Sequence, residues 1–375
     1  MRVLFLIHIL LLSHLSFAQV SDIKNDNPLY NKMDSSVHKH AMTYMSNENT
    51  IGLSIGIISG NKRHSYNYGE VNKGTQQLPS SDNFYGTGSI DKTFATMLLA
   101  NAVVERKVNL DDDIRNYLPE EYPNLSFERI PITFKNLANH TSGLPRAIKI
   151  YPKHLRDSIS QLSFTDQVEF YGSYSKDSLL TDLHLVKLDT IPGTKYQYNN
   201  NDVKVLILLL EFIYKNSYEI ILRNYLSNNL SMNDTKVELS KKEKLRAVTG
   251  YFRGEPQEFQ NFKGFYIGYP VISTINDMLQ YLDAQLSAKA EVIQLVQQLT
   301  WGNENGFGMG LGWMMDLDAT GDKYIYHSGN TRLGYNSMCL FYPELKLGMV
   351  VFVNDTNDLQ KVGNLVSGVK KDLVD

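Results

Sequence analysis

The chain has 375 residues, of which 42% are hydrophobic, and a formal net charge of −3 at pH 7. This length is enough for a large core in one domain or two closely packed subdomains. The near-neutral charge gives no reason to expect nucleic acid or an anionic membrane as a partner. Cys339 is the single cysteine, so an internal disulfide is excluded.

Residues 1–18 have the pattern of a secretory signal peptide. One positive charge precedes an apolar run from Val3 to Leu12, and small residues come before Gln19. The run is too short to span a membrane, and no later stretch reaches spanning length. We therefore expect an exported protein, periplasmic or secreted, without a transmembrane anchor in the mature chain, and with a loose polar lead-in over residues 19–35.

The first regular elements after this segment form a β-hairpin. A helix is expected over His38–Met45, followed by strands over residues 51–57 and 64–69. Ser54 lies in a G-x-S-x-G sequence, the nucleophile elbow of α/β-hydrolases. That elbow requires a strand, a sharp turn and then a helix, whereas the alternation here runs straight on into a second strand. We interpret Ser54 as an ordinary strand residue.

Ser89 and Lys92 stand three residues apart, just before an apolar helix expected over Thr93–Val104. This spacing places both side chains on one face of a helical turn, so that the amine can reach the hydroxyl. A serine needs a base to become a good nucleophile, and a lysine can serve only when burial lowers its pKa from about 10.4. In the alternative interpretation, Ser89 caps a core helix and Lys92 is a solvated charge.

The next segments contain two predicted helix caps. In the acidic run after Asn109, Asp111 is expected to cap a short helix over Ile114–Leu118, because the run lacks the glycine and glutamate of a calcium loop. Thr133 is expected to cap a second short helix, which ends in the turn Thr141-Ser142-Gly143-Leu144-Pro145.

The middle of the chain reads as mostly helical. Residues 146–190 are polar, with a helix over Thr165–Gly172, and a loop containing Tyr198 and Asn200 leads into an apolar helix over Val203–Ile213. Further helices are expected over residues 218–226 and 274–286. Strands are expected at residues 324–327, 337–341 and 348–354, before a last helix at 362–374.

This order predicts an α+β fold. The antiparallel sheet is assembled from both ends of one domain over residues 36–375. Its sheet subdomain is expected from about 36–88 and 300–375, with a mostly helical subdomain inserted at about 89–299.

Three short motifs stand in order along the chain: Ser89-x-x-Lys92, Tyr198-x-Asn200 and His327-Ser328-Gly329. Together with the run from Asn139 to Pro145, they resemble the serine β-lactamase and penicillin-recognising D,D-peptidase family. The likeness is to the branch that holds class C β-lactamases, D-alanyl-D-alanine carboxypeptidases and related esterases. It covers roughly residues 36–373 and implies the β-lactamase/transpeptidase-like fold.

The resemblance implies a role for each motif residue. Ser89 is expected to be the nucleophile that forms an acyl-enzyme, Lys92 its buried base, and Tyr198 a proton relay that depends on a positive neighbour. The substrate-binding residues implied are Asn200, which would hold the amide oxygen of the substrate, and the edge-strand residues His327, Ser328 and Gly329. Two backbone N–H groups, those of Ser89 and Asn330, are expected to form the oxyanion hole.

Structural roles stay open for several of these residues. Tyr198 fits a core aromatic, Asn200 a helix cap and His327 an ordinary strand histidine. His327 also stands where class C β-lactamases typically have lysine, and a histidine there holds a carboxylate more weakly or in a pH-dependent way. Arg332 is a candidate for that contact, and an ordinary surface arginine is the alternative.

The sequence thus predicts an exported serine hydrolase that acts through an acyl-enzyme. The expected substrates are small D-amino-acid peptides, amides or esters, including peptidoglycan-derived ones, with β-lactam hydrolysis less favoured. A non-catalytic penicillin- or peptidoglycan-binding sensor of the same fold is the alternative. Neither a cofactor nor a metal is expected, since His38-x-His40 has ligand-like spacing but no third ligand in view. Residues 146–190 are expected to form a wall or lid over the pocket.

Overall fold

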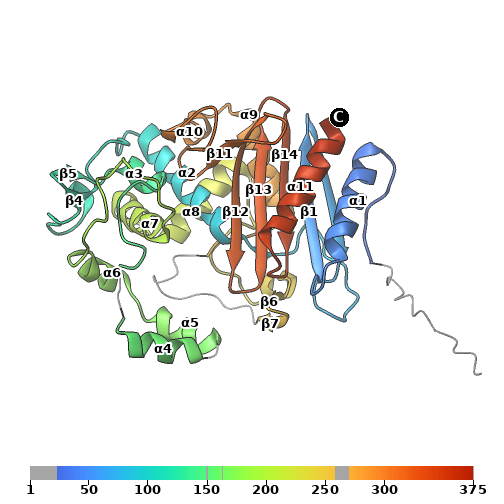
Figure 1. Ribbon diagram of the computed structural model, residues 1–375, viewed down its shortest axis with the longest axis horizontal. Helices are drawn as coiled ribbons and strands as arrows, with labels where there is room; N and C mark the ends of the chain where they lie inside the picture. Colours follow the sequence, from blue (N-terminus) through green and yellow to red (C-terminus); the bar gives the residue numbers. More distant parts are fainter. Residues whose placement is uncertain (1–22, 149–150, 163, 258–269, 375) are drawn as a thin grey trace, which may run out of the picture.

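A computed structural model describes residues 23–148, 151–162, 164–257 and 270–374 (Figure 1). The predicted signal peptide and the first part of the lead-in lie outside these residues. The helices are α1 (Lys32–Met45), α2 (Asp91–Val104), α3 (Phe134–Ala138), α4 (Lys153–Gln161), α5 (Phe164–Gly172), α6 (Lys176–Leu183), α7 (Asn200–Tyr214), α8 (Tyr218–Leu230), α9 (Ile275–Ser287), α10 (Glu291–Val296) and α11 (Leu359–Val374). Short 3₁₀ turns are η1 (Gly88–Ile90), η2 (Ile114–Tyr117) and η3 (Glu243–Arg246).

One antiparallel sheet dominates the described part of the chain. Its eight strands follow the order β2-β1-β14-β13-β12-β11-β10-β9. Their bounds are β1 (Gly52–Ser59), β2 (Lys62–Gly69), β9 (Trp301–Gly302), β10 (Gly308–Met309), β11 (Met314–Leu317), β12 (Lys323–Thr331), β13 (Tyr335–Tyr342) and β14 (Leu347–Val353). The N-terminal hairpin therefore pairs with the last strand, β14, as the predicted assembly from both chain ends requires.

Short two-stranded ladders complete the strand inventory. They pair β3 (Tyr85–Gly86) with β8 (Ile272–Ser273), β4 (Ser126–Phe127) with β5 (Ile130–Pro131), and β6 (Gly250–Phe252) with β7 (Glu255–Gln257).

Helices cover both faces of the sheet. Helices α1 and α11 pack on one face, where Val37, Leu365 and Val369 bury against strand residues such as Leu53 and Val351 (Figure 1). The other face carries the larger core, built with α2, α7, α8 and α9. Helix α2 is apolar on nearly every side because it lies between the sheet and the helical layer. The nucleophile segment therefore stands at the junction of the two layers.

Most predicted elements are confirmed, and the differences have local causes. The capping role assigned to Asp111 is wrong: the Asp113 side chain accepts the Arg115 N–H at the start of η2, while Asp111 pairs with Lys135. Thr133 caps α3 in a capping box with Asn136, as predicted.

The N-terminal part of the chain is more ordered than predicted. Helix α1 begins at Lys32, capped by Asn31, rather than near His38. The described lead-in is not loose, because Asn25 bridges to Tyr68 of β2 and Asp26 accepts hydrogen bonds from Asn67. Ser54 is a fully buried strand residue bonded to Asn67 and Tyr85, so the elbow interpretation is excluded.

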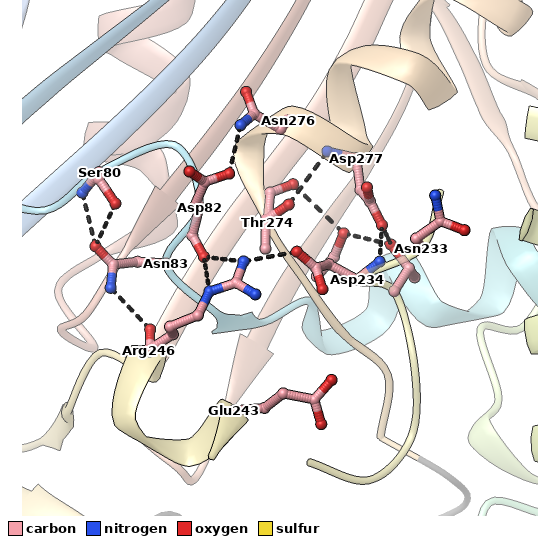
Figure 2. Close-up of polar contacts among 12 residues, drawn as sticks. Ser80, Asp82, Asn83, Asn233, Asp234, Glu243, Arg246, Thr274, Asn276 and Asp277 are labelled. Atoms are coloured by element: carbon pink, nitrogen blue, oxygen red, sulfur yellow. Dashed lines mark hydrogen bonds and ion pairs between the residues drawn. The ribbon is translucent and has the colours of Figure 1, made fainter. Parts of the chain in front are cut away.

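A polar cluster around Arg246 fastens the segment that leads to Ser89 (Figure 2). Arg246 donates to the Asp82 carbonyl at 2.7 Å and to the Asp234 carboxylate at 2.6 Å, and Asn276 donates to the Asp82 side chain. These bonds join the loop before β3 to the beginning of α9. Beyond β3, the Thr87 N–H and hydroxyl both bond to the Val271 carbonyl. The chain segment that leads to Ser89 is thus fixed by hydrogen bonds to several other segments.

Candidate active site

Ser89 and Lys92 meet where η1 joins α2. Lys92 Nζ donates a hydrogen bond to Ser89 Oγ at 3.0 Å. Lys92 is buried, whereas Ser89 is partly exposed and accessible to a substrate. No side chain caps the start of α2, so the cap role considered for Ser89 is not what the structure has. Instead, Ser89 lies in η1, directly before the start of α2.

The expectation of an uncharged Lys92 is wrong for this arrangement. Burial acts to lower the pKa of Lys92, but the Asp91 carboxylate, 3.5 Å from Nζ, and the Tyr198 hydroxyl together raise it above its ordinary value. Burial in turn raises the pKa of Asp91, against the opposing pull of Lys92. Lys92 is therefore an ammonium that donates to Ser89. The sequence analysis missed Asp91, although its place next to Lys92 was a visible signal.

Strand β12 passes very close to the nucleophile. A methyl group on the Cα of Gly329 would lie 2.8 Å from the Ser89 nitrogen, and one on Gly88 would lie 2.9 Å from the Asn330 nitrogen. Only glycine at both positions allows this approach, and Gly88 also has a φ of +55°. The backbone nitrogens of Ser89 and Asn330 are thereby brought to the same small region.

The outer edge of β12 is open beside Ser89. Strand β11 pairs only with residues 323–326 of β12, so among the described strands none covers the outer edge from His327 to Thr331. An unpaired strand edge offers backbone donors and acceptors to an extended ligand. The site thus combines a nucleophile with a pairing edge.

A turn between α3 and α4 holds the Tyr198 loop. Gln197 N donates to the His140 carbonyl and Gly193 N to the Thr141 carbonyl, both at 2.8 Å. The Asn199 side chain caps α7 and donates to the Leu144 carbonyl at 2.7 Å. The run from Asn139 to Pro145 therefore fixes the position of the Tyr198 loop through hydrogen bonds. This supporting role was not apparent from the sequence.

The loop places the Tyr198 ring against Lys92. Lys92 Nζ lies 5.5 Å from the ring centroid, and the hydroxyl of Tyr198 is a hydrogen-bonding partner of the amine. Tyr198, which is distant in sequence from Ser89 and Lys92, is thus brought to Lys92. Asn200 is the exposed first residue of α7, and Asn199 takes the capping role that was considered for Asn200.

Two buried histidines flank the Tyr198 ring. The ring centroid of His140 lies 4.7 Å and that of His327 6.2 Å from that of Tyr198. Burial, together with the charge of Lys92, lowers the pKa of each histidine to about 3. His327 is therefore neutral near pH 7, and its Nδ1 lies 2.8 Å from the Ser328 carbonyl oxygen. A titrating histidine in the third motif is not what the structure provides.

Residues missed by the sequence analysis complete the buried surroundings. His140 contacts the Asp202 carboxyl at 2.9 Å, and both side chains are fully buried. Lys204, one helical turn after Asn200, has its pKa lowered to about 8 by burial and by the charge of Lys92. Asp202 and Lys204 lie within the apolar start of α7, whereas His140 follows α3, so no local sequence pattern links these groups.

Asn330 lies near the C-terminal end of β12, and Arg332 directly follows this strand. Asn330 is exposed and its side-chain amide donates to the Asn336 oxygen at 2.5 Å. Arg332 is exposed and donates to the Gln167 oxygen of α5 at 2.8 Å. The polar segment that contains α4 and α5 is therefore fastened to the end of the site strand.

The described residues show no gathering of three or more side chains suited to hold a metal ion. Of the His38-x-His40 pair, His40 lies 3.0 Å from the Asp372 carboxylate instead. Nor does any helix in the described ranges have the length and hydrophobicity of a membrane span.

The architecture is that of the β-lactamase/transpeptidase-like fold. A β-lactamase/D-alanine carboxypeptidase from Pseudomonas syringae superposes with a TM-score of 0.74, over 91% of this chain and 99% of that one, at 20% identity. The family model described as Beta-lactamase matches residues 37–365. The chain therefore belongs to the Beta-lactamase family, of the serine β-lactamase/transpeptidase superfamily.

Curated relatives agree with this assignment. "Protein flp" of Staphylococcus aureus (strain MRSA252) is 26% identical over 318 residues, which cover 81% of this chain. The chain spans only 59% of the length of that relative. A "Beta-lactamase" of Escherichia coli (strain K12) is 22% identical over 355 residues, 85% of this chain and 88% of its own length.

Proposed function

We propose that the protein is an exported serine hydrolase that forms an acyl-enzyme on Ser89. Its proposed substrates are small D-amino-acid peptides, amides or esters. One observation carries the proposal: the partly exposed Ser89 hydroxyl accepts a hydrogen bond from the buried Lys92 amine beside an open strand edge. A serine held in this way can attack a carbonyl carbon that lies along β12.

The reaction needs an acceptor for the Ser89 proton. An ammonium already holds its full complement of protons, so the charged Lys92 cannot take another one. Its hydrogen-bonding partner Tyr198 is our candidate acceptor, and it can take the proton only in the phenolate form, which the neighbouring Lys92 charge would stabilise. The proton would pass from Tyr198 to the leaving group, and Tyr198 would later activate the water that releases the acyl group.

The developing oxyanion needs donors close to Ser89. We assign this role to the backbone N–H groups of Ser89 and Asn330, which the two glycines bring into one region. Loss of one such donor typically costs about 2.7–4 kcal/mol of transition-state stabilisation. Asn200 and His327 remain our candidates for contacts to the amide oxygen and the carboxylate of the substrate.

Covalent labelling tests the proposal directly. The purified mature protein should react with a fluorescent penicillin, and intact mass spectrometry should show one added acyl group, located on Ser89. Ser89→Ala should show no adduct, whereas Ser54→Ala serves as a control serine within the G-x-S-x-G sequence. Full labelling of Ser89→Ala would refute the assignment. Binding of the label without covalent adduct in the wild type would favour the sensor alternative.

Substrate class and export need separate measurements. Turnover of a D-Ala-D-Ala peptide, a p-nitrophenyl ester and a chromogenic cephalosporin would rank the substrate types, and we expect the cephalosporin to be the poorest. Expression of the whole chain followed by N-terminal sequencing tests export, with a mature N-terminus expected near Gln19.

A further inference from the structure

His140 contacts three consecutive residues of the Tyr198 loop. Its carbonyl oxygen accepts the Gln197 N–H at 2.8 Å, its ring lies 4.7 Å from that of Tyr198, and its Nδ1 accepts the Asn199 N–H at 3.4 Å. A single residue thus holds the backbone on both sides of Tyr198 and one face of its ring. Within the described residues no other contact of the loop brackets Tyr198 in this way.

The contacts of His140 and Asp202 indicate which of these two side chains carries the hydrogen that they share. Asp202 Oδ2 lies 2.9 Å from His140 Nδ1, and Oδ1 accepts a hydrogen bond from the Ser142 hydroxyl. A proton on Nδ1 would leave the Asn199 N–H without this acceptor. With Nδ1 unprotonated, its single lone pair accepts both from the Asn199 N–H and from a hydrogen on the Asp202 carboxyl group. Asp202 then donates from Oδ2 and accepts at Oδ1, whereas His140 Nε2 is buried without a hydrogen-bond partner among the described residues.

The surroundings favour this neutral arrangement. Both side chains are fully buried, where an ion pair carries a large desolvation cost. Burial raises the pKa of Asp202 well above its ordinary value and lowers that of His140 to about 3. The other titratable groups that face His140 are Lys92, Tyr196, Tyr198 and His327, and the positive charge of Lys92 opposes an imidazolium.

The backbone of His140 also departs from ordinary values. Its φ is +59°, in the left-handed region that is uncommon outside glycine, although asparagine, aspartate and histidine adopt it more often than other residues. Such a conformation persists where surrounding contacts fix it, and it is often associated with functional sites. The contacts that fix it here are those to Asp202 and to the Tyr198 loop.

We propose that His140 is the positioning residue for Tyr198, acting as a neutral imidazole whose Nδ1 accepts hydrogen bonds from Asn199 and from the protonated carboxyl of Asp202. This proposal rests on the proposed function for the catalytic role of Tyr198. The protonation state that it assigns to the pair does not depend on activity. The arrangement differs from an Asp–His relay, in which the carboxylate is charged and accepts from the imidazole.

The protonation state is tested by nitrogen NMR of the full mature chain labelled with ¹⁵N-histidine. His140 is assigned by its absence in His140→Asn. We expect an unprotonated Nδ1 and a protonated Nε2 throughout pH 5–8, and the same tautomer in Asp202→Asn, whose amide donates as the carboxyl does. A protonated Nδ1 in the wild type would overturn the proposal, whether or not the protein is catalytically active.

The positioning role is tested by acylation rates with whichever substrate labels the wild type. Asp202→Asn should stay within about threefold of the wild type, whereas His140→Leu, which loses the acceptor, should lower the maximal acylation rate by about tenfold or more with little change in KM. His140→Asn should recover part of the rate, since asparagine tolerates the left-handed backbone and offers an oxygen acceptor.

Two results would overturn the positioning role. One is a loss in Asp202→Asn as large as that in Asp202→Ala, which would indicate a charged carboxylate. The other is a wild-type rate in a folded His140→Leu. If His140→Leu does not fold, the acylation rates of Asp202→Asn and Asp202→Ala decide whether the positioning role holds. A wild type without any acylation would count against the proposed function, while the NMR result would still decide the protonation state.

Discussion

Gly329 of β12 lies against the backbone of Ser89, so closely that a methyl group on its Cα would be 2.8 Å from the Ser89 nitrogen. This contact sets the distance between the nucleophile and the strand along which we expect a substrate to pair. Two parts of the chain that are 240 residues apart, Ser89 and Gly329, thus form one wall of the site.

Gly329→Ala should lower the acylation rate by about 100-fold or more, because β12 and η1 must separate and the two amides near Ser89 lose their alignment. The measurement is the rate of adduct formation with a fluorescent penicillin. Gly363→Ala is the matched control, since a methyl group there would make only an ordinary contact, 3.8 Å from Met338 Cε. A Gly329→Ala protein that is acylated at the wild-type rate would contradict the close contact.

Asp91→Asn should move the alkaline limit of the acylation pH profile downward by about one unit or more. Without the Asp91 carboxylate, burial lowers the pKa of Lys92 with less opposition, so the ammonium is lost at lower pH. Asp111→Asn, which removes an exposed partner of Lys135, is the control and should leave the profile unchanged. If the neutral amine were the active form, the acid limit would move downward instead, and activity below neutral pH would rise.

His327 should make folding stability depend on pH below neutrality. Its pKa is about 3 in the folded protein and about 6.5 in the unfolded chain, so the unfolded chain binds more protons as the pH falls. The free energy of unfolding should therefore decrease between pH 7 and pH 5. This decrease should be about 2 kcal/mol larger in the wild type than in His327→Gln. His140 is less suitable for this test because the raised pKa of its partner Asp202 acts with the opposite sign.

Urea unfolding of wild type and His327→Gln at pH 7 and pH 5 gives this difference. The replacement of His154 by glutamine, at an exposed position of α4, serves as the control variant. A wild type and a His327→Gln variant that lose the same free energy between the two pH values would show that His327 is not held neutral by burial.

Arg332→Gln should distinguish a carboxylate contact from a purely structural one. If Arg332 contacts the substrate, KM should rise by about tenfold or more for a D-Ala-D-Ala peptide, which has a free carboxylate, and should not change for a neutral p-nitrophenyl ester. The control is Arg63→Gln on β2, which removes an ion pair with Asp283 of α9. An equal rise in KM for both substrates would indicate that Arg332 only attaches α5 to the site through Gln167.

Much of the fold was predictable because its signals are local. The alternation of the hairpin residues, the apolar runs of α2 and α7 and the Thr133 cap each depend on neighbours within a few residues. The cap at Asp113 was misplaced by two residues because several acidic side chains in a row fit the same pattern. The start of α1 was also missed, since its first turn is polar and packs through tertiary contacts to β2 and α11.

The sequence by itself determined the pairing of Ser89 with Lys92, because three residues of helical turn bring a hydroxyl and an amine together whatever the rest of the chain does. Only the tertiary structure decided the charge of Lys92 and the surroundings of Tyr198. The pKa of a buried amine depends on how burial balances against the particular oxygen atoms that surround it, and Tyr198 reaches it from across the fold. The contact between His140 and Asp202 likewise joins segments some 60 residues apart, and a periodic sequence pattern cannot predict such a contact.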